Sequence, residues 1–207
     1  MRMSITIAML SLMLPVWSLD GVAAERMAAR VQTADDAARL EQAARSYFTD
    51  TEVVTQHGKR MRFYSDVLKD RVVLINFVHT SCKNACPMMT RKLTLVRDLV
   101  ESQLSNPIQF ISISLDPARD TPAALKEFAK RHEADHAGWL FLTGKAEDVT
   151  HLIRKLGQYS EDLDAHSTIV LAGNVKTAHW AKIPPNVMPD AIAAKLQELV
   201  DDGKPKS

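Results

Sequence analysis

The sequence predicts an α/β domain with a central mixed sheet flanked by helices, preceded by an N-terminal helix and a β-hairpin. Two observations lead to this fold class. From residue 72 onward, short apolar runs alternate with segments of helical periodicity, which is typical of α/β proteins. Near the end of the chain, two apolar runs are separated only by a short turn, which predicts an antiparallel edge to the sheet.

The first 24 residues have the layout of a secretory signal peptide. Arg2 supplies a positive charge, residues 5–17 are almost wholly apolar, and small residues at 22–24 offer a cleavage site. The apolar core is short for a membrane span of about 20 residues, and a retained N-terminal anchor is the alternative. We therefore expect four parts: 1–24 signal peptide or short anchor, 25–50 N-terminal helical extension, 51–201 main domain, and 202–207 flexible tail.

The charge balance argues against nucleic acid as a partner. The chain has 26 basic and 25 acidic residues, a formal net charge of +1, so it has no strong attraction for polyanions or anionic membranes. We expect contact with a membrane only through an uncleaved N-terminal segment. The signal layout predicts an extracytoplasmic location, periplasmic in a bacterium, with inner-membrane anchoring as the variant.

Two elements are expected ahead of the main domain. Apolar residues recur at helical spacing over 33–48, with Thr33 and Asp35 as candidate N-caps. Residues 52–63 then have the composition of a hairpin that turns near His57 and Gly58.

The main domain is expected to alternate strands and helices. Thr121 or Asp120 caps a helix that begins at Pro122, and Gly157 ends another. The predicted strands are 72–78, 108–115, 139–142, a segment ending at 171, and 177–183; the predicted helices are 88–101, one from 122, 146–156 and 188–200. A strand, a cysteine pair, a helix, a crossover strand and a closing hairpin make a thioredoxin-like layout, a fold that carries many functions.

Cys82 and Cys86 are the only cysteines, and they lie where a buried strand is followed by a helix. In an oxidising compartment two cysteines normally form a disulfide. A disulfide over this spacing closes a very small loop and removes little entropy from the unfolded chain. A disulfide that forms and breaks reversibly is therefore a better interpretation than a structural one. The helix start favours the thiolate form, and the i, i+4 spacing predicts both sulfurs on one helix face.

Two converging thiolates can form a reversible disulfide or bind a soft metal such as Cu(I) or Zn²⁺. A metal would need a third ligand, most naturally a histidine. His166 follows a polar loop and precedes an inner strand, which makes it a candidate. His79 can lie beneath the cysteines, or it can be a core or strand-end histidine. His132 and His136 have ligand spacing, but the segment is highly polar and no cysteine lies near it in sequence, so a solvated helix end is the better interpretation.

Asp116 ends the second strand of the main domain, at the sheet edge where α/β sites gather. The same Asp-Pro pair is a common turn start, so a structural role is the alternative.

The chain resembles the Sco/SenC family from about residue 50 to about residue 200. The resemblance rests on three motifs in order: Cys82-x-x-x-Cys86-Pro87 after Ile75-Asn76-Phe77, then Leu115-Asp116-Pro117-Ala118-Arg119-Asp120-Thr121, and then His166-Ser167 before a strand. Members of this family are extracytoplasmic thioredoxin-fold proteins that bind copper and help assemble the copper centre of cytochrome c oxidase. Some members are thought to act as thiol–disulfide reductases.

The resemblance implies that copper, as Cu(I) or Cu(II), is bound by Cys82, Cys86 and His166. It implies a supporting role for Asp116. It also implies a partner that is the copper subunit of cytochrome oxidase or another exported thiol or copper protein. Family members commonly have Asp directly before this histidine, where this chain has Ala165, and Asp164 is the candidate substitute. A carboxylate beside a ligand histidine tunes its basicity, so this departure favours a redox role. The alternative function is therefore a thiol–disulfide oxidoreductase that uses the Cys82/Cys86 pair, which leaves open whether the chain is an enzyme.

Overall fold

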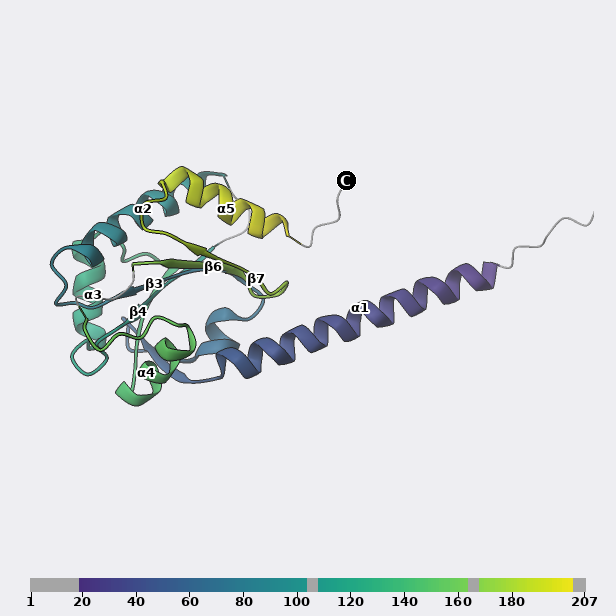
Figure 1. The fold of residues 1–207 in the computed structure, drawn as a ribbon, viewed down its shortest axis with the longest axis horizontal. Coiled ribbons are helices and arrows are strands. Elements are labelled where there is room, and N and C mark those ends of the chain that lie inside the picture. Colours follow the sequence, from purple (N-terminus) through teal and green to yellow (C-terminus); the bar gives the residue numbers. More distant parts are fainter. Residues whose placement is uncertain (1–18, 104–107, 164–167, 203–207) are drawn as a thin grey trace, which may run out of the picture. The chain divides into compact units, whose positions relative to one another are not determined.

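The computed structural model describes residues 19–103, 108–163 and 168–202 (Figure 1). The chain divides into two compact units, residues 1–38 and 39–207. Helix α1 (Leu19–Phe48) runs through this boundary and begins earlier than the expected residue 33. Its described side chains are exposed until Ala44, and Phe48 is buried. Among the described side chains of α1, those that contribute to a core lie at its end.

A seven-stranded mixed sheet forms the centre of the second unit, in the order β2-β1-β5-β4-β3-β6-β7. Strands β3, β4 and β5 are parallel, and the strands on either side of them are antiparallel to their neighbours. The strands are β1 (Glu52–Thr55), β2 (Arg60–Arg62), β3 (Val72–Val78), β4 (Gln109–Ser114), β5 (Trp139–Thr143), β6 (Val170–Asn174) and β7 (His179–Ile183). The predicted mixed sheet is thus confirmed.

Helices cover both faces of this sheet. One face packs against α2 (Ala85–Gln103), α3 (Pro122–Arg131) and α5 (Pro189–Asp201). The other face packs against the end of α1, the π-helix η1 (Phe63–Leu68) and α4 (Ala146–Lys155). Successive residues of β3 alternate between the two cores, because successive side chains of a strand point to opposite faces. Leu74 and Val78 belong to the first core, and Val73, Ile75 and Phe77 belong to the second.

Local signals set most element ends. The hairpin turns at Gly58, whose φ of 77° favours glycine, and Gly157 ends α4 with a φ of 68°. Thr121 caps α3 by accepting a hydrogen bond from the Ala124 N–H. The π-helix η1 has no counterpart among the predicted elements. Its turn is held by tertiary contacts, including the Asp50 carboxylate, which accepts the Ser65 N–H.

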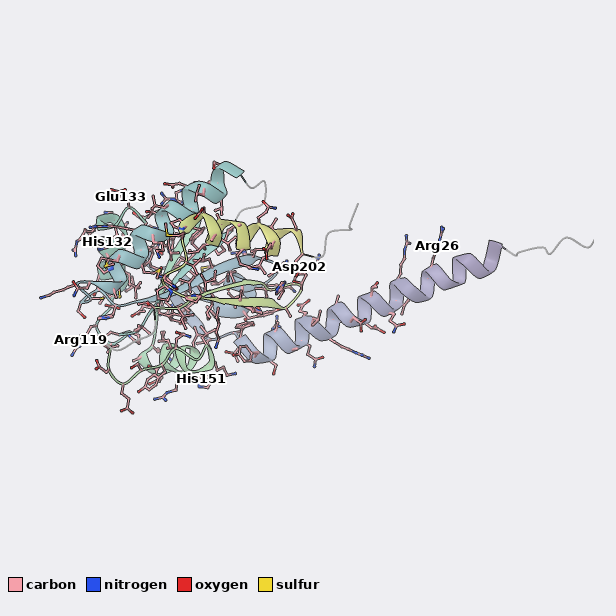
Figure 2. All side chains as sticks on the ribbon, turned by 45° about the horizontal axis from the view of Figure 1, so that its top comes forward. Arg26, Arg119, His132, Glu133, His151 and Asp202 are labelled. Carbon is pink, nitrogen blue, oxygen red and sulfur yellow. The ribbon has the colours of Figure 1, made fainter. Side chains whose placement is uncertain are left out.

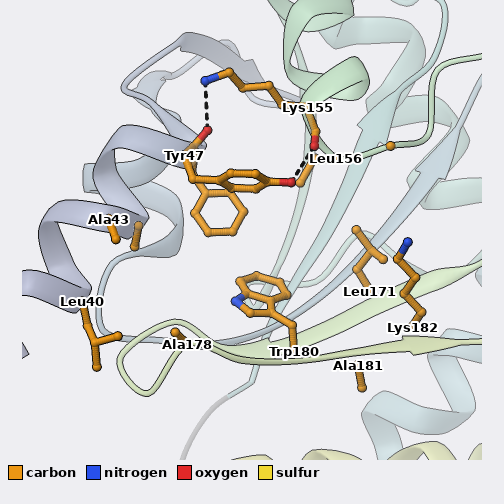
Figure 3. Close-up of a pocket in the computed structure, with 13 residues that line it drawn as sticks. Leu40, Ala43, Tyr47, Lys155, Leu156, Leu171, Ala178, Trp180, Ala181 and Lys182 are labelled. Atoms are coloured by element: carbon orange, nitrogen blue, oxygen red, sulfur yellow. Dashed lines mark hydrogen bonds between the residues drawn. The ribbon is translucent and has the colours of Figure 1, made fainter.

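A cavity of about 520 Å³ lies between the end of α1, the end of α4 and strands β6 and β7 (Figure 3). The Tyr47 hydroxyl donates to the Lys155 carbonyl at 2.7 Å, and the Phe48 and Trp180 rings lie 5.1 Å apart. Neither cysteine lines this cavity. The residues that line it are those through which the end of α1 packs against the sheet.

Among the helices of the described residues, none combines the length and the apolar character that crossing a membrane requires.

Candidate metal centre

The candidate site lies at the corner between the end of β3 and the start of α2. Strand β3 ends at Val78 and His79 follows directly. The chain turns so that the Cys82 N–H donates to the His79 carbonyl at 3.1 Å, and α2 begins at Ala85. Cys82 thus precedes the helix, and the expectation that both cysteines share a helix face is wrong.

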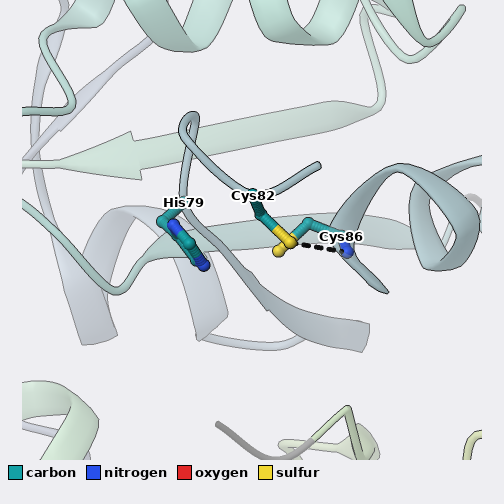
Figure 4. Close-up of side chains that lie close together, drawn as sticks. All are labelled: His79, Cys82 and Cys86. Carbon is teal, nitrogen blue, oxygen red and sulfur yellow. Dashed lines mark hydrogen bonds between the residues drawn. The ribbon is translucent and has the colours of Figure 1, made fainter. Parts of the chain in front are cut away.

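The two sulfurs nevertheless converge, together with an imidazole (Figure 4). One ligand atom each from His79, Cys82 and Cys86 lies within 4.8 Å of the others. The Cys86 N–H donates to Cys82 Sγ at 3.2 Å, and no disulfide joins the two cysteines. Cys82 Sγ thus accepts a hydrogen bond from an N–H in the first turn of α2. The loop before α2, rather than the helix itself, brings the two sulfurs together.

The two thiols differ in their surroundings. Cys86 is 1% exposed and belongs to the apolar core, whereas Cys82 is half-buried. Burial raises the pKa of the Cys86 thiol to about 12, aided by its hydrogen bond with Cys82 and opposed by a backbone hydrogen bond with His79. The expected thiolate is therefore wrong for Cys86 in the metal-free protein, because desolvation outweighs the helix N-terminus.

A buried carboxylate holds this corner in place. Asp120 is 1% exposed and accepts hydrogen bonds from the Thr80 N–H at 3.1 Å and the Thr80 hydroxyl at 2.6 Å. Its other oxygen accepts the Ser114 hydroxyl at 2.6 Å. Asp120 thereby joins the loop before Cys82 to the end of β4. The sequence offered it only as a helix cap, a role that Thr121 takes instead.

Asp116 lies just beyond β4, as predicted, and is half-buried. Its N–H donates to Ser114 Oγ at 3.1 Å, and its carboxylate accepts from Arg119 at 3.1 Å. Through Ser114 it borders the Asp120 network. Two other candidates, Asp164 and His166, lie outside the described residues, and their roles stay predictions.

The remaining histidines have ordinary surroundings. His132 caps the end of α3 and packs edge-on against Phe128, and burial lowers the pKa of its imidazole (Figure 2). His136 is exposed beside Glu101 at 3.4 Å, and His151 is exposed on α4. The structure therefore gives His132 a helix-end role and places His136 in the connection between α3 and β5.

His79 is the residue whose place the sequence left open. It is 2% exposed, and its Nδ1 lies 2.9 Å from Ser81 Oγ. The available signal was its spacing of three residues before Cys82 at the end of a buried run. That spacing alone does not say on which side of the turn a ring will lie.

The SCO1/SenC family model matches residues 39–201 of the chain. The SCO1 protein homolog of Bacillus subtilis is 35% identical over 92 residues, which cover 44% of this chain and 46% of that protein. The chain spans about half the length of the curated relatives it matches.

Solved structures show the same fold. ScoI of Arabidopsis thaliana, solved with copper bound, has a TM-score of 0.64 at 20% identity, covering 74% of this chain and 98% of that one. BsSco, described as having a disulfide switch and as a member of the Sco family of cytochrome c oxidase assembly proteins, has a TM-score of 0.62 at 22% identity, covering 73% and 92%. The predicted thioredoxin-like fold agrees with these neighbours.

Proposed function

Because the chain belongs to the SCO1/SenC family, we propose that it is an extracytoplasmic copper-binding protein that assists assembly of the copper centre of cytochrome c oxidase. The observation that carries this proposal is the convergence of two thiols and an imidazole at one corner of the fold. Thiolates are soft ligands that select Cu(I), and imidazole suits copper in either oxidation state. Two solved structures support the same assignment: ScoI of Arabidopsis thaliana contains copper, and BsSco is described as a member of a family of cytochrome c oxidase assembly proteins.

The proposed ligands are Cys82, Cys86 and His166. The two cysteines have the required geometry, and His166 is assigned from its family motif. Asp116 supports the end of β4, and Asp164 takes the place of the carboxylate that family members commonly have before the histidine. Copper is cargo in this proposal, taken up by the reduced pair and passed to the copper subunit of the oxidase or to another exported copper protein.

A second function, thiol–disulfide oxidoreductase, is favoured by the unequal burial of the two thiols. Half-buried Cys82 can attack a disulfide of a partner protein, which forms a mixed disulfide and releases one partner thiolate. Cys86 then attacks Cys82 Sγ and releases the second partner thiol. The chain ends oxidised as a Cys82–Cys86 disulfide, and the partner gains the two electrons.

Residues 1–24 are proposed as the export signal or a short anchor, and residues 25–50, 51–201 and 202–207 as the extension, the family domain and the tail. A SCO1/SenC lipoprotein of Bacillus anthracis among the structural neighbours supports placement outside the cytoplasm. A periplasmic location is part of the same proposal. Fractionation of cells that express the full chain tests it, with osmotic-shock release expected if the signal is cleaved.

Copper titration of the freshly reduced protein tests the metal function. We expect one copper per chain, and strong loss of affinity in Cys82→Ser, Cys86→Ser and His166→Ala. His151→Ala is the matched control, because this exposed histidine lies on α4 and belongs to none of the family motifs. Absence of copper binding by the reduced wild type would contradict the proposal.

The two functions separate in a second measurement. Reduction of a model protein disulfide requires both cysteines but not His166. If the reduced wild type reduces the model disulfide but binds no copper, the oxidoreductase is the better description.

A further inference from the structure

We propose that His79 is a direct ligand in a Cu(I) site with Cys82 and Cys86, an inference that rests on the proposed copper function. This site is formed within residues 79–86, by the last turn of the chain before α2. It differs from the motif-based ligand set, in which the histidine lies far along the sequence. The geometry therefore assigns a chemical role to a buried histidine that the motifs do not include.

The distances fit a metal with little rearrangement. Bonds from sulfur and imidazole nitrogen to a metal are about 2.0–2.3 Å, so three ligand atoms arranged trigonally around one metal lie about 3.7–4.0 Å from one another. The atoms of His79, Cys82 and Cys86 lie within 4.8 Å without a metal. A small rotation of the Cys82 side chain, which is half-buried, is enough to close the difference.

The ring of His79 is already oriented. Its Nδ1 lies 2.9 Å from Ser81 Oγ, so a metal would bind through Nε2 while Nδ1–H donates to the hydroxyl. Ligand histidines commonly donate their other ring N–H to an oxygen in this way, which fixes the tautomer and the ring plane. Ser81 is thus a positioning residue for His79.

The surroundings suit Cu(I) rather than a harder ion. Cys86 lies in the apolar core with Val78 and Met89, and Cys82 packs against the same core. Two sulfurs and one nitrogen form a soft donor set that supplies neither the oxygen ligands nor the six positions that Mg²⁺ requires. Binding replaces two thiol protons with one Cu(I) and releases the protons to solvent.

The backbone ties the three ligands together before any metal arrives. The Cys82 N–H donates to the His79 carbonyl at 3.1 Å, and the Cys86 N–H donates to Cys82 Sγ at 3.2 Å. Asp120 holds the intervening Thr80 by two hydrogen bonds. The arrangement of the three ligands within residues 79–86 is therefore largely preformed.

The test is Cu(I) titration of the reduced full chain against a competing chelator, in wild type, His79→Phe, His166→Ala and the double variant. His79→Phe keeps a ring of similar size in the core and removes both nitrogens. His132→Phe is the matched control, because this histidine is also buried but lies at the end of α3. Far-UV circular dichroism and a count of two reactive thiols after unfolding confirm that each variant is folded and reduced.

We expect His79→Phe to weaken Cu(I) binding at least about tenfold in the wild-type and the His166→Ala backgrounds, with no change in His132→Phe. X-ray absorption of Cu(I)-loaded His166→Ala should show two sulfurs and one nitrogen, and the double variant should lose the nitrogen. Unchanged affinity and an unchanged nitrogen signal in His79→Phe would overturn the role of His79 and leave the copper function standing. No Cu(I) binding by the wild type would instead overturn the copper function itself.

Discussion

Asp120 shows how one buried side chain can determine the shape of a site that it does not enter. Its carboxylate accepts three hydrogen bonds, two from Thr80 and one from Ser114. Hydrogen bonds to charged groups contribute about 1.5–3 kcal/mol each, and donors left buried without an acceptor carry a further cost. Asp116, two residues from Ser114, accepts instead from Arg119, whose side chain is 78% exposed.

This contrast gives a residue-scale prediction. Asp120→Ala should lower the free energy of unfolding by about 2–4 kcal/mol, because it leaves buried hydroxyl and amide donors without their acceptor. The matched control Asp116→Ala should cost less than about 1 kcal/mol, since its ionic partner Arg119 is largely exposed and such pairs contribute little. Urea denaturation of the reduced proteins measures both, and equal losses would contradict the structural role of Asp120.

The two thiols give a second residue-scale prediction, on pH. The pKa of Cys86 is raised to about 12, so this thiol is neutral at pH 8 and gains thiolate only as the pH rises toward 12. Iodoacetamide reacts with thiolates, so at pH 8 it should modify half-buried Cys82 well before Cys86 in the folded, metal-free protein. The Cys86 labelling rate should then rise about tenfold per pH unit up to the onset of unfolding.

Mass spectrometry of tryptic peptides distinguishes the two sites. Cys82→Ser is the control, because it leaves Cys86 as the only thiol. Rapid labelling of Cys86 at pH 8 in that folded variant would contradict the raised pKa.

At the scale of elements, the pairing of β6 with β7 depends on the close packing of a tryptophan ring against a glycine. Gly173 lies opposite Trp180 across the antiparallel ladder, and a Cβ at Gly173 would lie 2.4 Å from the Trp180 ring. The Trp180 ring in turn packs against Phe48 at the end of α1. The glycine therefore makes room for the ring that joins this sheet edge to the helix.

Gly173→Ala should lower the free energy of unfolding by about 1–3 kcal/mol, because the added methyl group overpacks the ring. In a Trp180→Ala background the same substitution should cost much less, which a double-mutant cycle measures. Gly138→Ala is the control, since its Cβ would meet nothing closer than 3.6 Å. Equal costs in both Trp180 backgrounds would rule out the proposed clash.

At the scale of the whole molecule, the fold consists of a sheet with an apolar core on each face, and both cores lie within residues 39–207. The end of α1 belongs to the second core through Phe48, which is 7% exposed. Residues 1–38 form a separate compact unit.

Deletion of residues 1–38 should therefore leave the free energy of unfolding of the domain within about 0.5 kcal/mol of the full chain, because no described residue of either core lies in this range. Deletion of residues 1–48 should lower it by about 3–5 kcal/mol, the usual cost of removing a buried phenylalanine. Denaturation followed by tryptophan fluorescence measures both, and equal stability of the two truncated chains would contradict the assignment of Phe48 to the core.

The sequence by itself determined the order and type of nearly all elements, since the apolar period distinguishes strands from helices without tertiary information. Gly58, Thr121 and Gly157 act through local backbone preferences, and their roles were predicted for the same reason. The cysteine pair and the family motifs also pointed to the corner between β3 and α2, where His79, Cys82 and Cys86 lie close together. The π-helix η1 was missed, because it depends on contacts such as that of Asp50 with Ser65 rather than on a periodic pattern.

Only the tertiary structure decided what surrounds the cysteine pair. It placed Cys82 before the helix instead of on it, buried Cys86 deeply enough to keep its proton, and brought Asp120, which lies just ahead of α3, to Thr80. It also placed the ring of His79 beside both sulfurs. Spacing along the chain predicts which residues are near a turn, but burial and the side on which each side chain falls depend on packing between distant segments.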